Sequence, residues 1–299
     1  MKLLLLGANG QVGFELRRSL APLGDVVAAT RDGRLSNGGA CETADFDEPA
    51  SLAAMVERIA PDVVLNAAAW TAVDRAESER DAAFRTNAEA PRAIAEACAR
   101  RGTRLVHYST DYVFDGCGKR PYREDDKTSP LGVYGESKLA GEEAVRASGA
   151  DHVILRTAWV YAPRGKNFLL TMLRLGAERD RLRVVADQVG TPTCAALIAD
   201  TTAQVIAHPS RASGTWHLTA GGQTSWHGFA EAILAGAVER GLLPHAPEVE
   251  AISTADYPTP AARPAYSVLD TTRLQRDFGI VLPDWREGLA RALDVLERD

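Results

Sequence analysis

A tyrosine and a lysine four residues apart, Tyr134 and Lys138, are the residues of this sequence best suited to acid–base chemistry. Residues at this spacing lie one turn apart on the same face of a helix. Tyrosine is a poor acid or base near neutral pH, because its ordinary pKa is about 10. A neighbouring ammonium stabilises the phenolate and lowers that pKa, which favours proton transfer. On its own, the pair is equally explained by two exposed helical side chains.

Thr110 extends this pair to a set of three. It stands in the string Ser109-Thr110-Asp111, at the end of an apolar run that predicts a strand. Ligands of open α/β sheets bind at the carboxyl ends of the strands. We therefore expect the Thr110 hydroxyl to hold a carbonyl oxygen beside Tyr134, with Lys138 adjusting the pKa of the phenol.

Three glycines, Gly7, Gly10 and Gly13, lie between the first apolar run and the first helical segment. Glycines permit a tight turn and a close approach of the backbone to a pyrophosphate, which the N–H groups of the following helix then bind. The spacing is GxxGxxG, and a glycine-rich turn also arises for steric reasons alone. The position between strand and helix favours dinucleotide binding, with Gln11 and Val12 beside the pyrophosphate.

The end of the second predicted strand indicates which dinucleotide binds. NAD enzymes usually place an acidic residue there for the ribose 2′-hydroxyl. Here Thr30 and Arg31 come first and Asp32 follows. A cation suits a 2′-phosphate, so NADPH is favoured, while Asp32 leaves NADH open. The alternative for Arg31 is a solvated loop charge.

The elements that position these residues alternate along the first half of the chain. Five short apolar runs predict strands, at residues 3–6, 25–29, 62–66, 104–109 and 152–156. Segments with helical periodicity lie at residues 11–20, 51–59, 82–101 and 139–147. This alternation predicts βαβ units. We therefore expect an α/β fold, with a Rossmann-like, doubly wound parallel sheet.

After about residue 160 the pattern loosens. Helices are predicted at residues 167–178, 195–208 and 226–240, a strand at 216–219, and two last segments at 272–278 and 285–296. We expect an NAD(P)-binding domain over residues 1–160. Residues 161–299 are expected to form mainly a smaller C-terminal substrate-binding lobe, with room for some segments to return to the sheet domain.

Composition excludes several classes of protein. The chain has 299 residues, 45% of them hydrophobic and 25% charged, and a net charge of −6. This charge argues against a nucleic-acid partner. No apolar stretch approaches the roughly 20 residues needed to span a bilayer. The four cysteines form no CxxC pair, so we expect reduced thiols, no metal and a cytoplasmic protein.

The motifs together resemble the extended short-chain dehydrogenase/reductase superfamily, and within it the dTDP-4-dehydrorhamnose reductase family. The resemblance runs nearly end to end, over residues 7–13, 66–69, 71–74, 108–114, 134–142, 156–161 and 187–193. The string Ser-Thr-Asp-Tyr-Val-Phe at 109–114 is far more specific than the glycine loop. The resemblance implies that NAD(P)H reduces the C4 ketone of dTDP-4-dehydro-L-rhamnose to give dTDP-L-rhamnose.

The resemblance also implies a role for each site residue. Tyr134 donates the proton, Lys138 tunes it and holds the nicotinamide ribose, and Thr110 contacts the carbonyl. The implied substrate-binding residues are Thr110, Asp111, Tyr134, Trp159 and Arg263. The cofactor-binding residues expected from the loop and the resemblance are Gly7, Gly10, Gln11, Val12, Gly13, Arg31, Asp45, Phe46, Ala69, Trp70, Thr71, Tyr134 and Lys138.

Three positions depart from the family pattern. Trp70 stands where a smaller aromatic residue or histidine is expected, and Tyr266 replaces an asparagine in an Arg-Pro-x-Asn-Ser pattern. Some family members dimerise through a magnesium-bound glutamate cluster. Glu15 matches one of its positions, but Ala196 occupies another. We therefore expect a monomer or weak homodimer without metal, and a solvated Glu15.

Two other functions stay open. One is an epimerase or dehydratase of the same superfamily, which keeps its cofactor bound and returns the hydride. The other is a non-catalytic, NADP-binding regulatory subunit, against which intact Thr110, Tyr134 and Lys138 argue. The tryptophans at the edges of later elements, Trp216, Trp226 and Trp285, are interpreted as packing residues.

Overall fold

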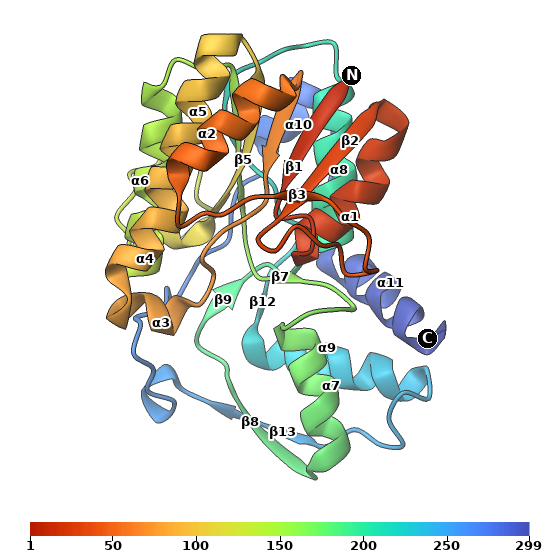
Figure 1. Cartoon of the computed structure of the whole chain (residues 1–299). Helices are drawn as coiled ribbons and strands as arrows, with labels where there is room; N and C mark the ends of the chain where they lie inside the picture. Colours follow the sequence, from red (N-terminus) through yellow and green to blue (C-terminus); the bar gives the residue numbers. More distant parts are fainter. Residues whose placement is uncertain (299) are drawn as a thin grey trace.

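The computed structural model, which describes residues 1–298, is built on a seven-stranded sheet (Figure 1). Its strands are β1 (Lys2–Leu6), β2 (Asp25–Thr30), β3 (Glu42–Thr43), β4 (Val63–Asn66), β5 (Arg104–Thr110), β6 (His152–Thr157) and β11 (Gly214–His217). They run parallel in the order β11-β6-β5-β4-β1-β2-β3. The order reverses between β1 and β4, as in the doubly wound sheet that the sequence predicts.

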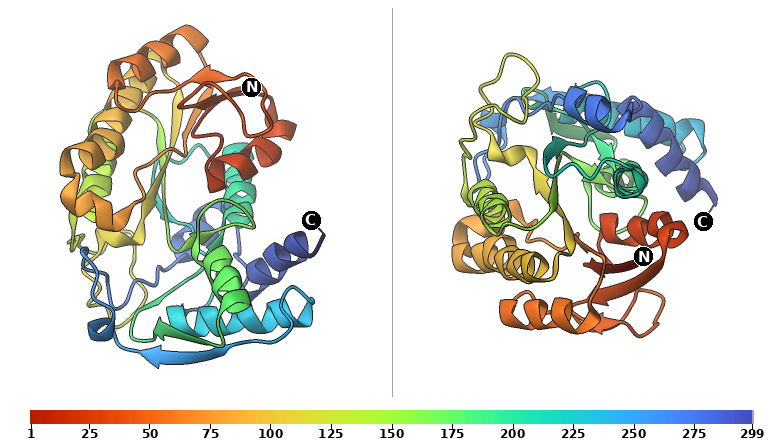
Figure 2. Two further views of the ribbon diagram at one scale, coloured as in Figure 1. Left: turned by 60° about the horizontal axis from the view of Figure 1, so that its bottom comes forward. Right: turned by 90° about the horizontal axis from the view of Figure 1, so that it is seen from above.

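Both faces of this sheet are covered by helices (Figure 2). One face packs on α2 (Pro49–Ile59), α5 (Ala90–Arg101) and α6 (Val133–Ala147). The other packs on α1 (Gln11–Leu20), α8 (Ala195–Ala207) and α10 (Thr272–Phe278). Side chains of β1 alternate between these two cores, since Leu4 and Leu6 join the first and Leu3 and Leu5 the second. A run of leucines buried on both faces is typical of a parallel strand.

The helix predicted over residues 82–101 does not keep one regular α-helical hydrogen-bond pattern. After α3 (Val73–Ser78), the chain forms α4 (Arg80–Phe84), a π-helical turn η2 (Arg85–Glu89) and then α5. Pro91 has no N–H to donate back to Asn87, so a regular α-helical ladder fails at this point. Gly141 of α6 packs against the Asn87 carbonyl, where an added Cβ would lie 2.1 Å from the oxygen. The wider turn therefore forms where proline and a close helix contact coincide.

A smaller part lies below the carboxyl ends of the strands. It contains α7 (Phe168–Glu178), α9 (Trp226–Glu239), α11 (Trp285–Arg298) and the parallel pair β8 (Arg181–Val185) and β13 (Glu248–Ile252) around its own apolar core. The short strands are β7 (Val160–Tyr161), β9 (Val189–Gly190), β10 (Thr193–Cys194) and β12 (Thr224–Ser225), and the 3₁₀ turns are η1 (Ala21–Leu23), η3 (Asp111–Val113) and η4 (Thr254–Asp256). Within residues 1–298, no helix combines the length and apolarity needed to cross a bilayer.

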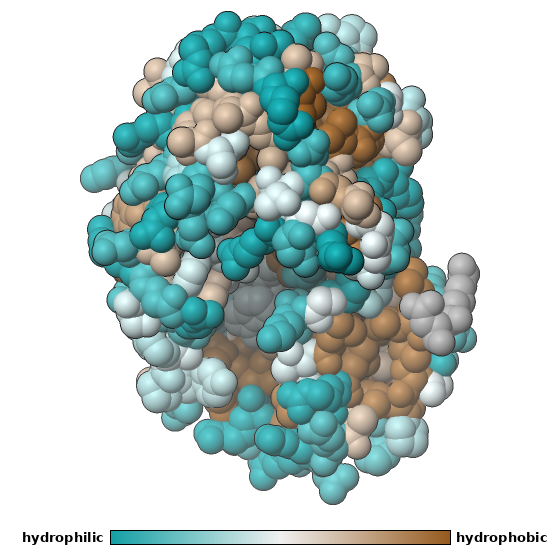
Figure 3. All heavy atoms as spheres, in the orientation of Figure 1, coloured by the Kyte–Doolittle hydropathy of each residue, from teal (hydrophilic) through white to brown (hydrophobic). Residues whose placement is uncertain are grey.

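Segments after residue 160 contribute both to the sheet part and to the smaller part. The predicted strand at 216–219 is observed as β11, an edge strand of the main sheet beside β6. The helices α8 and α10 also pack on the sheet. The space-filling view shows the surface hollowed between the sheet part and the smaller part (Figure 3).

Candidate active site

A cavity of about 640 Å³ lies at the carboxyl ends of β1, β4, β5 and β6. Most of the predicted site residues line it: Gly7, Gly10, Gln11, Val12, Arg31, Phe46, Ala69, Thr71, Thr110, Asp111, Tyr134, Lys138, Trp159 and Arg263. Three predicted cofactor residues do not line it, namely Gly13, Asp45 and Trp70. The fold therefore brings together side chains from widely separated parts of the sequence at the edge of the sheet where ligands bind.

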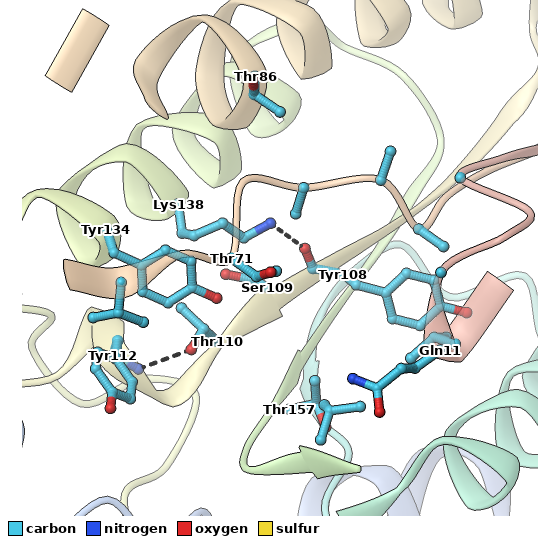
Figure 4. Close-up of a pocket in the computed structure, with 18 of the residues that line it drawn as sticks. Gln11, Thr71, Thr86, Tyr108, Ser109, Thr110, Tyr112, Tyr134, Lys138 and Thr157 are labelled. Carbon is cyan, nitrogen blue, oxygen red and sulfur yellow. Dashed lines mark hydrogen bonds between the residues drawn. The ribbon is translucent and has the colours of Figure 1, made fainter. Parts of the chain in front are cut away.

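The tyrosine–lysine pair lies in the first two turns of α6. Gly132 precedes this helix and has no side chain to cap it, and the Glu77 carboxylate instead accepts from the Val133 N–H at 2.9 Å. Figure 4 shows the phenol of Tyr134 directed toward Thr110, and the Lys138 ammonium donating to the Tyr108 carbonyl at 2.6 Å. Both side chains thus point from one helix face into the cavity.

Burial controls the protonation of this pair. It raises the pKa of Tyr134 to about 12, an effect that the Thr110 hydroxyl opposes and the Asp111 carboxylate reinforces. Burial also lowers the pKa of Lys138 to about 8, opposed by the Glu142 carboxylate. Lys138 therefore does not produce the expected lowering of the Tyr134 pKa in the folded chain. At neutral pH the phenol keeps its proton and can act as an acid.

Thr110 and Asp111 line the cavity beside Tyr134. The Thr110 hydroxyl donates to Asp111 Oδ1 at 3.0 Å and accepts from the Tyr112 N–H at 3.2 Å. Asp111 is 1% exposed, and burial raises its pKa to about 6. Its Oδ2 atom has no hydrogen-bond partner among the described residues. A buried acceptor of this kind is suited to a hydroxyl group of a ligand.

Trp159 forms one wall of the cavity in an unusual backbone conformation. Its φ is +46°, in the left-handed region that side chains other than glycine rarely adopt. The indole stacks on Trp226 with centroids 3.6 Å apart and planes 5° apart. Gly190 lies so close that an added Cβ would be 2.5 Å from the same indole. Trp226 packs against the core of the smaller part, as expected from the sequence, and it also lines the cavity.

The glycine loop at residues 7–13 makes a tight turn before α1, which would allow an anion to approach its backbone. Gly7 has φ +81°, and an added Cβ would lie 2.7 Å from the Ala68 nitrogen. Gly13 faces inward, where an added Cβ would lie 2.1 Å from the Gly7 oxygen. This explains why Gly13 packs the helix on the loop rather than lining the cavity. No side chain caps the N-terminus of α1, so its N–H groups fit a pyrophosphate.

Two residues of opposite charge, Arg31 and Asp32, follow β2, and only one of them lines the cavity. The Asp32 carboxylate is turned back into its own turn, where it accepts from the Thr30 hydroxyl at 3.0 Å and the Arg34 N–H at 3.3 Å. Arg31 lines the cavity instead. Asp45 accepts from the Asp47 N–H at 2.9 Å, away from the cavity. A cation rather than an acid therefore faces the cavity here.

The loop around Trp70 is held by a residue that sequence reasoning missed. The Trp70 side chain leaves the cavity, packs beside α3 and α4, and donates from Nε1 to the Ala72 carbonyl at 3.1 Å. Asn87, in the π-helical turn, accepts from the Trp70 N–H at 2.9 Å and donates to the Trp70 carbonyl at 3.1 Å. It also donates to the Ser137 hydroxyl at 3.0 Å. One amide thus joins the loop to α6.

Two charged residues have partners that the sequence did not reveal. Arg263 lines the cavity, but its guanidinium pairs with Asp74 at 2.8 and 3.1 Å. Glu15 is 12% exposed and pairs with Arg164 at 2.9 Å, so the expectation of a solvated side chain was wrong. No cluster of three or more potential metal-ligating side chains is found in residues 1–298. Further lining residues missed by sequence reasoning include Thr86, Ser109, Thr157 and Lys166.

The chain is similar to known proteins over almost its whole length. The family described as the RmlD substrate binding domain matches residues 1–298. The dTDP-4-dehydrorhamnose reductase of Burkholderia thailandensis is 52% identical over 295 residues, which cover 96% of each chain. A solved dTDP-4-dehydrorhamnose reductase from Clostridium acetobutylicum has a TM-score of 0.90 and 37% identity, covering 99% of this chain and 100% of its own. The enzyme from Bacillus anthracis, solved in complex with NADP, has a TM-score of 0.89 and 34% identity, with 98% and 99% covered.

Proposed function

Because the chain belongs to the dTDP-4-dehydrorhamnose reductase family, we propose that it reduces the C4 ketone of dTDP-4-dehydro-L-rhamnose with NADPH. NADH is a weaker alternative cofactor. One observation carries the proposal: Tyr134, Lys138 and Thr110 line the same cavity as the glycine loop and the uncapped start of α1. We further propose that the protein acts in the cytoplasm as a monomer or weak homodimer.

Each catalytic side chain has a separate task in this proposal. When bound, the reduced nicotinamide supplies a hydride to the carbonyl carbon. Tyr134, which keeps its proton at neutral pH, donates that proton to the carbonyl oxygen and becomes a phenolate. Lys138 stabilises the phenolate with its positive charge until solvent returns the proton. The Thr110 hydroxyl orients the carbonyl toward the phenol.

A coupled assay tests the proposed reaction. Purified protein is given dTDP-4-dehydro-L-rhamnose generated in situ, and oxidation of NADPH is followed with NADH in parallel. We expect one NADPH consumed for each dTDP-L-rhamnose formed. A protein purified with tightly bound NAD and consuming no NADPH would instead indicate an epimerase or dehydratase. Binding of NADPH without any turnover would indicate a regulatory subunit.

Arg31 is expected to determine the preference for NADPH. A charge-assisted hydrogen bond contributes about 1.5–3 kcal/mol, so Arg31→Ala should raise the KM for NADPH about tenfold or more while the KM for NADH changes little. Steady-state kinetics with both cofactors measure this. Arg34→Ala is the matched control, since Arg34 is exposed and does not line the cavity. An equal change for both cofactors in Arg31→Ala would contradict the assignment.

A further inference from the structure

The loop at residues 162–167 crosses from the smaller part onto the start of α1. Asn167 donates to Gln11 Oε1 at 2.8 Å, and also to the carbonyls of Ala162 at 2.8 Å and Arg164 at 2.9 Å. Its own Oδ1 accepts from the Leu170 N–H at 3.1 Å and caps α7. One asparagine therefore fixes the loop to the phosphate-binding turn and to the helix that follows.

A second contact holds the other side of the loop. The Arg164 guanidinium pairs with Glu15 at 2.9 Å and lies over the Phe14 ring at 3.5 Å from its centroid. Both partners belong to α1. Lys166 lies between the two anchors, so its backbone is held over the cavity although its side chain is exposed.

Lys166 differs from Lys138 and Arg263, two of the other cations that line the cavity. Lys138 donates to the Tyr108 carbonyl and Arg263 pairs with Asp74. Arg31 follows β2 and, like Lys166, has no hydrogen-bond or ion-pair partner within residues 1–298. Lys166 lines the same cavity and has no hydrogen-bond or ion-pair partner within residues 1–298. The glycine loop at residues 7–13 contains no lysine or arginine. A diphosphate bound near this loop would meet backbone N–H groups but no side-chain cation from the loop itself.

We propose that Lys166 binds a diphosphate in the cavity, and that the Asn167–Gln11 and Arg164–Glu15 contacts position its ammonium for that purpose. This inference rests on the proposed function, because NADPH and the nucleotide sugar each carry a diphosphate. An exposed side chain on an anchored backbone suits this task, because a lysine side chain has several rotatable bonds through which the ammonium can reach a phosphate oxygen. NADPH and the nucleotide sugar would present the same diphosphate chemistry to Lys166. Separate binding measurements therefore identify which of the two it binds.

The test uses the full chain with Lys166→Met and Lys166→Arg. Titration with NADPH, followed by nucleotide fluorescence, and calorimetry with dTDP give two dissociation constants for each variant. We expect Lys166→Met to weaken one of the two by about tenfold or more, and Lys166→Arg to keep most of the affinity. Lys119→Met is the matched control, because Lys119 is exposed and lies outside the cavity.

The outcomes separate this inference from the proposed function. Weaker NADPH binding alone assigns Lys166 to the cofactor, and weaker dTDP binding alone assigns it to the substrate. If Lys166→Met binds both ligands as tightly as the wild type, the inference is wrong while the proposed function stands. A wild-type protein that binds neither ligand would instead overturn the proposed function. Thermal unfolding should be unchanged, because the exposed Lys166 side chain makes no hydrogen bond or ion pair with residues 1–298.

Discussion

Tyr134→Phe is expected to lower kcat by about 10²–10⁴-fold, the usual contribution of a positioned acid, while NADPH binding stays close to that of the wild type. The substitution removes only the phenol oxygen, which carries the proton that the ketone oxygen must receive. The partly buried ring remains in place on α6. Single-turnover NADPH oxidation measures the chemical step, and fluorescence titration measures NADPH binding.

Tyr112→Phe provides a control within the same cavity. Its ring contacts Tyr134 edge to face, with centroids 5.6 Å apart, and it also lines the cavity. The proposed mechanism gives the Tyr112 hydroxyl no proton to transfer, so this variant should keep most of the wild-type kcat. If both substitutions reduced kcat equally, or if Tyr134→Phe left it unchanged, Tyr134 would not be the acid.

The second large effect concerns stability and a carboxylate on α6. Glu142 is 0% exposed and accepts from Arg156 Nε at 2.8 Å and Nη2 at 2.7 Å, and also from Arg146. Glu142→Gln keeps the size of the side chain but leaves the buried Arg156 guanidinium without its counter-charge. We expect the free energy of unfolding to fall by about 3–5 kcal/mol. Urea denaturation followed by far-UV circular dichroism measures the change.

An exposed pair serves as the comparison for Glu142. Arg75 and Glu79 are paired at 2.7 Å on one helical turn with both side chains exposed, so Glu79→Gln should cost only about 0.3–0.5 kcal/mol. Replacing both Glu142 and Arg156 with methionine should recover part of the loss, because no unpaired charge remains. A loss for Glu142→Gln no larger than that for Glu79→Gln would show that the buried pair contributes little.

The same pair predicts an acid dependence of stability. Burial raises the pKa of Glu142, but its contacts with Arg156 outweigh this effect and hold the pKa below the ordinary value. A lowered carboxyl pKa contributes stability above the unfolded-state pKa, and that contribution is lost as the pH falls through the folded-state pKa. The difference between wild type and Glu142→Gln should therefore shrink as the solution is acidified.

Sequence patterns were sufficient to predict the sheet and the common location of Thr110, Tyr134 and Lys138. Buried runs such as residues 3–6 specify parallel strands, and the end of one strand brings Thr110 to the edge where α6 presents Tyr134. These are consequences of periodicity and of the rule for ligand sites in open sheets. They do not depend on which side chains finally touch.

The features that were missed or left open depend on side-chain contacts made in the folded chain. Asp32 and Arg31 are neighbours in sequence, but hydrogen bonds within the turn decide which of them faces the cavity. The pKa of Tyr134 rises rather than falls because the folded chain buries the phenol. Trp226 and Trp159 belong to segments far apart in the sequence, and their indoles meet only in the folded chain. Periodicity carries no information on such pairings.

The return of β11, α8 and α10 to the sheet has a consequence for protein engineering. A fragment ending near residue 160 would leave β6 as a bare edge and uncover the apolar face that α8 and α10 protect, a combination that favours aggregation. Chimeras that exchange everything beyond this point would replace β11, α8 and α10 together with the smaller part. A graft limited to residues 162–192 and 219–265 would leave β11, α8 and α10 native and keep the sheet covered.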